Sequence, residues 1–284
     1  MEKLSIEELK KLENKIILYN CFFKYAEKYS NTDCDKKYLP QNLIKLYYEI
    51  TDDISFDLLK SSFIKHYIDN ESEVEKVHSN FERKGLREMY KYLHQYDTSK
   101  MDIYTILELH EKLYMHGPHP EFGGHFRTAE AFLPGSGADL CDHWNIRYKI
   151  IELKPYVKEL IEKGKELHGT TDFNKLFSYI EECIKLKCDL MRIHPFQDGN
   201  GRCLRGFTNM LFELSNIPPI YVRSTEQFDY RKAMRDTDIG MYDNINNFYY
   251  HKICESIIEL ELDNMRKENK KALKLLRPYV REDN

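Results

Sequence analysis

One stretch of the chain, His194 to Arg205, concentrates residue types that could perform chemistry. It runs His-Pro-Phe-Gln-Asp-Gly-Asn-Gly-Arg-Cys-Leu-Arg and combines an imidazole, a carboxylate, a glycine-rich turn and two guanidinium groups. An imidazole with a pKa near neutrality can take the proton from an attacking hydroxyl group. His194 is therefore the candidate general base.

The glycine-rich turn predicts a site for an anion. Residues 199–201 tolerate a tight backbone, and apolar residues at helical spacing resume at Leu204, so a helix should begin at about residues 199–201. The first turn of a helix presents unpaired backbone N–H groups and a positive dipole end. Arg202 and Arg205 lie three residues apart on one face of this helix, and guanidinium groups bind phosphate oxygens bidentately. The pattern therefore predicts a polyphosphate site.

Asp198 precedes this turn and is the candidate ligand of a divalent cation. Mg²⁺ usually takes one or two carboxylates and completes its shell with phosphate oxygens and water. The alternative is that His194 only caps a helix and that residues 199–201 form an ordinary turn. The occurrence of all these features within one short stretch favours the functional interpretation.

The stretch resembles the signature of Fic-domain proteins, His-Pro-Phe-x-(Asp/Glu)-Gly-Asn-Gly-Arg-x-x-Arg, at every fixed position. The resemblance implies transfer of a nucleotide monophosphate, usually AMP from ATP, to a protein hydroxyl group. It also implies the following roles: His194 as base, Asp198 as ligand of Mg²⁺ or Mn²⁺, Gly199, Asn200 and Gly201 as phosphate cradle, Arg202 and Arg205 as partners of the β and γ phosphates, and Phe196 as buried anchor.

An acidic segment far upstream could regulate this site. By composition the segment around Glu75 is a solvent-exposed acidic helix face. It also resembles the inhibitory helix of some Fic proteins, in which a Ser or Thr stands four residues before a Glu that is followed by Gly or Asn. Glu71 and Lys76 depart from that pattern, which weakens the helix cap and the close approach of the helix. The resemblance implies that Glu75 pairs with Arg205 and excludes the γ-phosphate.

Two further segments complete the resemblance. Residues 122–142 are rich in turn residues and predict a β-hairpin, similar to the Fic flap, along which a target protein would dock by main-chain pairing. Arg127 within this segment is expected to be structural. Tyr230 is the candidate residue on the adenine side of the nucleotide pocket, and an ordinary core tyrosine is the alternative.

The elements that must position these residues are predicted to be helices. Apolar periodicity predicts helices over residues 6–29, 43–50, 54–78, 86–94, 103–115, 144–162, 173–193 and 244–262, with a further helical stretch at 267–276. Pro195 should end the helix that leads to His194. The fold class expected is all-α, a Fic-like core with a short β-hairpin flap. The domains expected are an N-terminal extension at 1–100 with an inhibitory helix at about 66–80, a catalytic core at 101–262 and a charged tail at 263–284.

Composition narrows the class of protein. The chain has 284 residues, a formal net charge of −4 and no dense block of basic residues, so nucleic acid is not the expected partner. The seven cysteines show no Cys-x-x-Cys spacing, and no apolar stretch is long enough to span a membrane. The expected location is the cytoplasm, and export as an effector stays open because effectors need no cleaved signal.

The function that follows is a protein adenylyltransferase using Mg·ATP, regulated by Glu75, with a Ser, Thr or Tyr hydroxyl group as acceptor. Self-modification and a homodimer are left open by the sequence. Alternatives are other chemistry of the same family, namely phosphoryl transfer, transfer from other nucleotides or removal of AMP, and a nucleotide-binding module without catalysis. The target protein and the preferred base are not determined by these residues.

Overall fold

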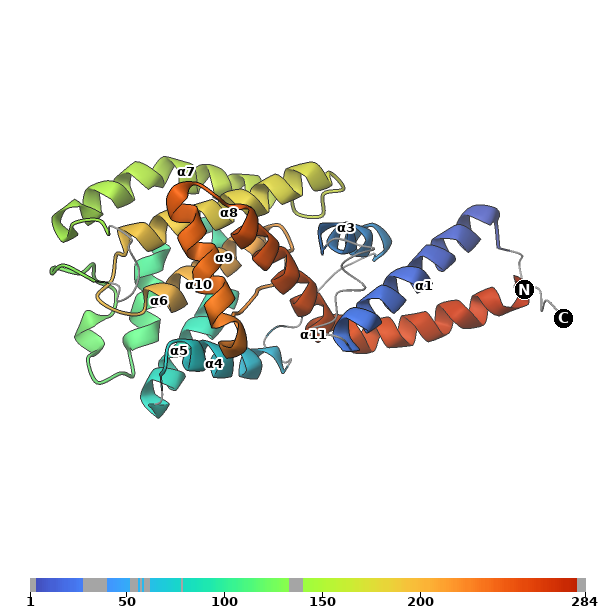
Figure 1. The fold of residues 1–284 in the computed structure, drawn as a ribbon, viewed down its shortest axis with the longest axis horizontal. Helices are drawn as coiled ribbons and strands as arrows, with labels where there is room; N and C mark the ends of the chain where they lie inside the picture. Colours follow the sequence, from blue (N-terminus) through green and yellow to red (C-terminus); the bar gives the residue numbers. More distant parts are fainter. Residues whose placement is uncertain are drawn as a thin grey trace. The chain divides into compact units, whose positions relative to one another are not determined.

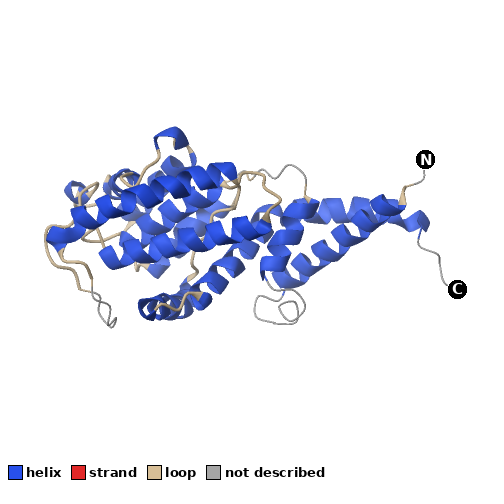
Figure 2. Ribbon diagram, turned by 90° about the horizontal axis from the view of Figure 1, so that it is seen from above, coloured by secondary structure: helices blue, strands red, loops and turns tan. Residues whose placement is uncertain are grey.

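The structure is a computed structural model that describes residues 4–27, 40–51, 56, 58, 62–77, 79–132 and 140–279. Every regular element within these residues is a helix (Figures 1 and 2). The α-helices are α1 (Ile6–Glu27), α3 (Pro40–Ile50), α4 (Phe63–Val74), α5 (Asn80–His94), α6 (Thr105–Tyr114), α7 (Ile146–Glu166), α8 (Phe173–Ile193), α9 (Asn200–Leu214), α10 (Gln227–Asp236) and α11 (Asp243–Leu276). Short 3₁₀ turns occur at Thr98–Lys100, Pro120–Phe122, His143–Asn145, Ser224–Glu226, Thr237–Ile239 and Arg277–Tyr279.

The chain divides into two compact units. The larger unit comprises Asp57–Lys252, and the smaller comprises Met1–Phe56 together with Ile253–Asn284. Helices α4 and α5, which were expected in an N-terminal extension, thus belong to the same compact unit as the candidate site. The domain boundaries expected at residues 100 and 262 stay a prediction.

The smaller unit is built from α1, α3 and the C-terminal part of α11. In Figure 1, α1 (blue) lies alongside the end of α11 (red), and Lys15 Nζ lies 3.6 Å from Glu268 Oε2. The aromatic rings of Phe22 and Tyr47 meet edge to face between α1 and α3, with centroids 5.8 Å apart. The closing helix and the helical tail expected from the sequence are one continuous helix, α11.

Helix α9 is the centre of the larger unit. It packs against α5, α6, α7 and α8, and almost every one of its residues is buried. A helix that is covered on all sides is normally apolar. This helix nevertheless carries buried Arg202 and Arg205 near its start, with 3% and 2% of their surface exposed. Two buried charges at the start of a central helix require partners, and these define the site described below.

The expected helix over residues 54–78 is shorter in the structure. Helix α4 ends at Val74, and Lys76 adopts a left-handed backbone with φ 55° that stops it. Helix α5 then starts at Asn80, where the Ser79 hydroxyl group accepts the backbone N–H of Glu82 at 3.1 Å. The hydrophobic periodicity across residues 54–78 did not reveal this break.

The β-hairpin expected over residues 122–142 is wrong. Residues 122–132 and 140–142 contain no strand, and residues 133–139 lie outside the described part of the chain. The reason is that backbone N–H groups of this segment bond to other parts of the chain. The N–H of Arg127 donates to the carbonyl of Pro195 at 2.9 Å.

The other side of this segment makes a similar contact. The N–H of Cys141 donates to the carbonyl of Arg192, in the last turn of α8, at 3.1 Å. A two-stranded ribbon needs these backbone groups to pair across the ribbon. Here the N–H of Arg127 bonds to Pro195 and that of Cys141 bonds to the end of α8. Residues 122–132 and 140–142 are therefore attached to the candidate site.

In the described part of the chain, the longer helices are all too polar to be membrane spans.

We expect Gly85→Ala to destabilise the larger unit. A Cβ atom at Gly85 would lie 2.0 Å from the backbone oxygen of Leu113, so α5 and α6 would have to separate. Overpacking costs about 1–3 kcal/mol, against a gain of at most ~1 kcal/mol from replacing a helical glycine. Thermal unfolding followed by circular dichroism should give a lower Tm for Gly85→Ala and an unchanged Tm for Lys84→Ala, an exposed neighbour. Equal Tm values for the two variants would contradict this packing.

Candidate active site

His194 stands at the junction between α8 and the motif loop. Its N–H donates to Leu190 O at 2.9 Å as the C-cap of α8, and its backbone is left-handed with φ 49°. This geometry turns the chain out of the helix before Pro195, as the sequence predicted. The Nδ1 atom of the His194 ring lies 3.4 Å from Met191 O, an acceptor, which favours a proton on Nδ1 and leaves Nε2 with the lone pair.

Asn200 closes the motif loop on itself. Its side-chain oxygen accepts the N–H of Phe196 at 2.9 Å, and its amide donates to the carbonyl of Phe196 at 2.7 Å. The Phe196 ring is fully buried, as expected for an anchor, and stacks on the ring of His110 with centroids 3.9 Å apart. The side chain of Asn200 is thus occupied within the loop, and its backbone N–H is the group available to the cradle.

His110 supports the loop from α6, a role that the motif itself does not indicate. It is 1% exposed. Its Nε2 atom lies 3.0 Å from Asp198 O, which can only accept, while its Nδ1 atom accepts the N–H of Gly124 at 3.1 Å. Burial lowers the pKa of His110 to about 4, so the ring is neutral and serves both bonds. In the sequence, His110 falls on the apolar face of its helix beside Leu109 and Leu113, and this position could have predicted its burial.

Asp198 carries the carboxylate at the edge of the loop. Its Oδ2 atom accepts from the Tyr114 hydroxyl group at 2.6 Å and from Arg202 Nη2 at 3.2 Å. Burial opposes ionisation, but these donors outweigh it and the pKa of Asp198 is lowered. The group is therefore an anion, and its side chain is 70% exposed.

This single carboxylate fits one role for a metal ion. In the described part of the chain, no three His, Cys, Asp or Glu side chains converge as a metal site. A cage made only of protein ligands is therefore not what these residues form. Asp198 does fit Mg²⁺ that arrives with a phosphate chain, because such an ion needs only one or two carboxylates.

Helix α9 begins where the sequence predicted a helix start. Gly199, with φ 77°, is the N-cap, and the first helical bond runs from Cys203 N–H to Gly199 O at 3.0 Å. The preceding N–H groups, of residues 200–202, have no acceptor within the helix. The buried Nε atom of Arg202 also has no hydrogen-bond acceptor among the described residues. A buried charged donor without an acceptor is costly, and an anion in the cradle would satisfy it.

Arg205 is held by α4. Its Nη2 atom lies 2.7 Å from Glu75 Oε1, the pair expected from the sequence. Burial raises the pKa of Glu75, but the charge and hydrogen bond of Arg205 outweigh it and the pKa is lowered. Glu71 also binds Arg205. In the sequence, Glu71 is notable only as a departure from the inhibitory pattern. A glutamate one helical turn before Glu75 was the signal that could have found it.

The approach of α4 depends on Gly201. A Cβ atom at this position would lie 2.5 Å from Glu75 Oε1 and 3.0 Å from Arg205 Nη1. A side chain at this position would therefore require the ends of Glu75 and Arg205 to shift. Burial lowers the pKa of His194, and the charges of Asp198 and Glu75 act in the opposite direction.

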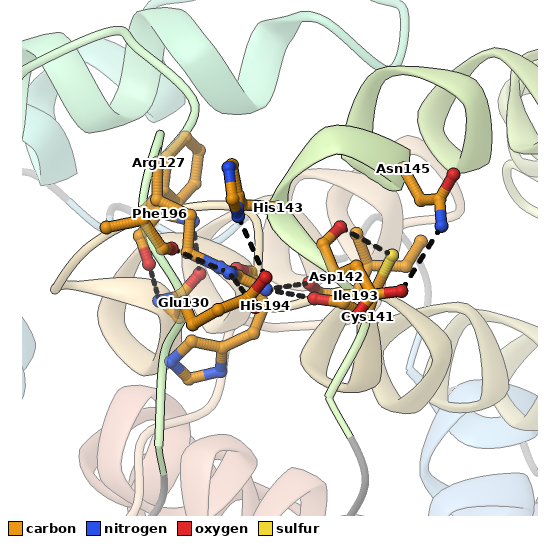
Figure 3. A network of polar contacts seen from close by, with 11 residues as sticks. Arg127, Glu130, Cys141, Asp142, His143, Asn145, Ile193, His194 and Phe196 are labelled. Atoms are coloured by element: carbon orange, nitrogen blue, oxygen red, sulfur yellow. Dashed lines mark hydrogen bonds and ion pairs between the residues drawn. The ribbon is translucent and has the colours of Figure 1, made fainter.

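Arg127 links residues 122–142 to His194, as Figure 3 shows. It is buried, and its Nε atom donates to His194 O at 2.7 Å. Its Nη1 atom donates to Ala129 O at 2.9 Å, and its Nη2 atom donates to Cys141 O. All these acceptors are backbone carbonyls, so the structural role expected for Arg127 fits its contacts.

Tyr230 lies next to Arg205. It is 6% exposed, and the centre of its ring is 5.8 Å from Arg205 Cζ and 4.6 Å from Lys187 Nζ. Lys187 Nζ also donates to the Tyr230 hydroxyl oxygen. The role of Tyr230 on the adenine side stays a prediction.

With this geometry in place, the comparisons with known proteins identify the domain. The model of the Fic/DOC family matches residues 100–212, which include the whole motif loop. Residues 100–212 form a Fic domain.

Two curated relatives share this Fic domain. A protein adenylyltransferase Fic from Nematostella vectensis is 27% identical over 163 residues, which are 55% of this chain and 34% of that protein. The protein adenylyltransferase Fic from Aedes aegypti is 26% identical over 168 residues, 55% of this chain and 29% of that protein. The chain thus aligns with about a third of the length of these relatives.

Solved structures share the fold. A fragment of Fic-1 from C. elegans has a TM-score of 0.57 at 17% identity, covering 82% of this chain and 72% of that chain. A Fic domain containing signaling protein from Bacteroides thetaiotaomicron has a TM-score of 0.52 at 15% identity, covering 95% of this chain and 99% of that chain.

We expect Lys76→Gly to stabilise the end of α4. Lys76 N–H bonds to Glu73 O at 3.1 Å and Val77 N–H to Ser72 O at 2.7 Å, a Schellman motif with lysine in the left-handed position. Glycine relieves about 1 kcal/mol of strain there, which should raise the Tm by roughly 2–4 °C. Lys65→Gly, an exposed interior position of the same helix, should lower the Tm instead. A lower Tm for Lys76→Gly would show that the lysine is not strained.

Proposed function

We propose that this chain is a protein adenylyltransferase that moves AMP from ATP to a Ser, Thr or Tyr hydroxyl group of a protein. The observation that carries the proposal is the start of α9. Unpaired backbone N–H groups, two buried arginines and an unsatisfied Arg202 Nε lie at the start of the helix that follows the His194 loop. The Fic domain and relatives named protein adenylyltransferase Fic support it.

His194 supplies the proton transfer in this proposal. Its Nε2 atom takes the proton of the target hydroxyl group, whose oxygen forms a bond to the α-phosphorus of ATP. The bond from that phosphorus to the bridging oxygen breaks, and pyrophosphate leaves. Positioning and charge stabilisation supply most of the rate enhancement in such reactions. The left-handed backbone of His194 and the Arg127 contact to its carbonyl hold the imidazole in place.

The leaving phosphates lie in the cradle. Backbone N–H groups of residues 200–202 and the guanidinium groups of Arg202 and Arg205 bind them. Asp198 would hold Mg²⁺, which neutralises charge on the phosphate chain when bound. The Tyr114 hydroxyl group, 2.6 Å from Asp198 Oδ2, fixes the carboxylate for that purpose.

In this proposal the site is inhibited by Glu75, and the contact between Glu75 and Arg205 supports it. Glu75 lies on Arg205 at 2.7 Å, where a γ-phosphate oxygen would bind. The carboxylate and the phosphate compete for one guanidinium group, so ATP binds with all three phosphates in place only when Glu75 leaves. Glu75 is at the end of α4 and its side chain is 28% exposed, so it can leave towards solvent.

The target protein docks beside residues 122–132 and 140–142 in this proposal. Both stretches are tied to the backbone around His194 by Arg127, so a bound segment would face the base. Docking through the backbone accepts many sequences. A nucleotide-binding module without catalysis is the alternative function, and the labelling experiment below separates the two.

We expect Glu75→Gly to raise self-labelling with radiolabelled ATP by about tenfold or more, because it frees one donor of a buried guanidinium group. Labelling by ATP carrying the isotope on the α-phosphate, with none from the γ-phosphate, identifies AMP as the group transferred. His194→Ala in the Glu75→Gly background should bind ATP and show no labelling. Labelling that survives the loss of His194 would exclude this mechanism, and ATP binding without labelling by Glu75→Gly would favour the binding module.

The pH dependence should report the His194 pKa. Burial lowers this pKa below the ordinary 6.5, and the Arg127 charge adds to the decrease against the opposing contact of Met191 O. A base must be neutral, so the rate should be constant at neutral pH and fall as the pH drops through the lowered pKa.

This profile is measured as kcat/KM for ATP in AMP transfer by Glu75→Gly, which reports the free enzyme, from about pH 5 to pH 8. The midpoint of the acid limb should lie below pH 6.5. A midpoint above that value would contradict a buried, neutral His194.

A further inference from the structure

Arg205 has two carboxylate partners that share its Nη2 atom, and one of them also binds Nε. Glu71 lies along one edge, with Oε1 at 2.8 Å and Oε2 at 3.0 Å from Nε, and Oε2 at 2.5 Å from Nη2. Glu75 contacts only Nη2. The Glu71 pair is therefore the more extensive of the two.

The two carboxylates also differ in how easily they can leave. Glu71 is fully buried within α4, whereas the side chain of Glu75 is 28% exposed at the end of that helix. An ionised carboxylate that loses its partner in the interior is strongly destabilised. Incoming phosphate can therefore displace Glu75 into solvent, while Glu71 remains on Arg205.

The charges around the cradle support the same distinction. Two guanidinium groups, Arg202 and Arg205, are contacted by three carboxylates, those of Asp198, Glu71 and Glu75. When Glu75 leaves, each arginine still has one carboxylate. The end of the cradle at Arg205 then carries no net charge, so a terminal phosphate gains the donor that Glu75 released but little electrostatic attraction.

We propose that Glu71 is a specificity-determining residue that neutralises Arg205 and so weakens its attraction for the terminal phosphate of the donor even after Glu75 has left. This inference rests on the proposed use of a nucleotide by this site and adds a second control to it. The consequence is that the Glu75-free site discriminates weakly between a nucleoside triphosphate and a diphosphate. The residue expected at this place from the resemblance is Ser or Thr, which carries no charge, so the effect belongs to this chain.

The experiment is calorimetric titration of the full chain with Mg·ATP and Mg·ADP. In Glu75→Gly the two nucleotides should bind with dissociation constants within about threefold, because Arg205 remains paired. Glu71→Gln in the same background keeps an oxygen acceptor on Nε but removes the charge. It should tighten ATP binding by about tenfold or more and leave ADP binding within about threefold.

Two further variants keep the test decisive. Glu73→Gln in the Glu75→Gly background removes the same charge from an exposed position of α4 and should change neither constant. Glu71→Thr replaces Glu71→Gln if thermal unfolding shows that the glutamine variant does not fold, and the same ATP-specific gain is expected.

The outcomes separate this inference from the proposed function. A preference of more than tenfold for ATP in Glu75→Gly, or no ATP-specific gain on neutralising Glu71, overturns the role of Glu71 alone. The first of these results needs no Glu71 variant. Absence of binding of either nucleotide to any variant overturns the proposed function itself. An equal gain for ATP and ADP would assign Glu71 a general electrostatic effect and also reject the proposal.

Discussion

The structure depends on keeping two arginines charged inside a protein core. Arg202 and Arg205 lie in the first turns of α9, the most enclosed helix of the larger unit. A buried guanidinium group needs acceptors of opposite charge, and α4 and the motif loop provide them through Glu71, Glu75 and Asp198. The same requirement explains why the arginines suit phosphate, which is the other strong acceptor that could reach them.

Meeting that requirement fixes the positions of other groups. Gly201 leaves room for Glu75 beside Arg205, because a Cβ atom there would lie 2.5 Å from Glu75 Oε1. The left-handed backbone of Lys76 ends α4 directly after Glu75. The contact between Glu75 and Arg205 thus forms at a helix end and beside a glycine, and Glu71 adds a second carboxylate to the same arginine.

The motif loop is held instead by hydrogen bonds to backbone groups. Asn200 binds both backbone groups of Phe196, and His110 uses one ring nitrogen for Asp198 O and the other for Gly124 N–H. Arg127 donates hydrogen bonds to the carbonyl groups of Ala129, Cys141 and His194. Because these bonds use the backbone, the loop tolerates changes in exposed side chains while its shape stays constant.

The sequence by itself determined the helical class, the end of α8 at His194, the start of α9 and the chemical character of residues 194–205, because backbone propensities and residue types act locally. It also identified the pair of Glu75 and Arg205 through resemblance. Only the tertiary structure decided that residues 122–132 and 140–142 form no strand, that His110 is a buried support and that Glu71 binds Arg205. Those outcomes depend on which distant group satisfies a buried donor or charge, and this is set when α4, α6 and α8 pack around α9.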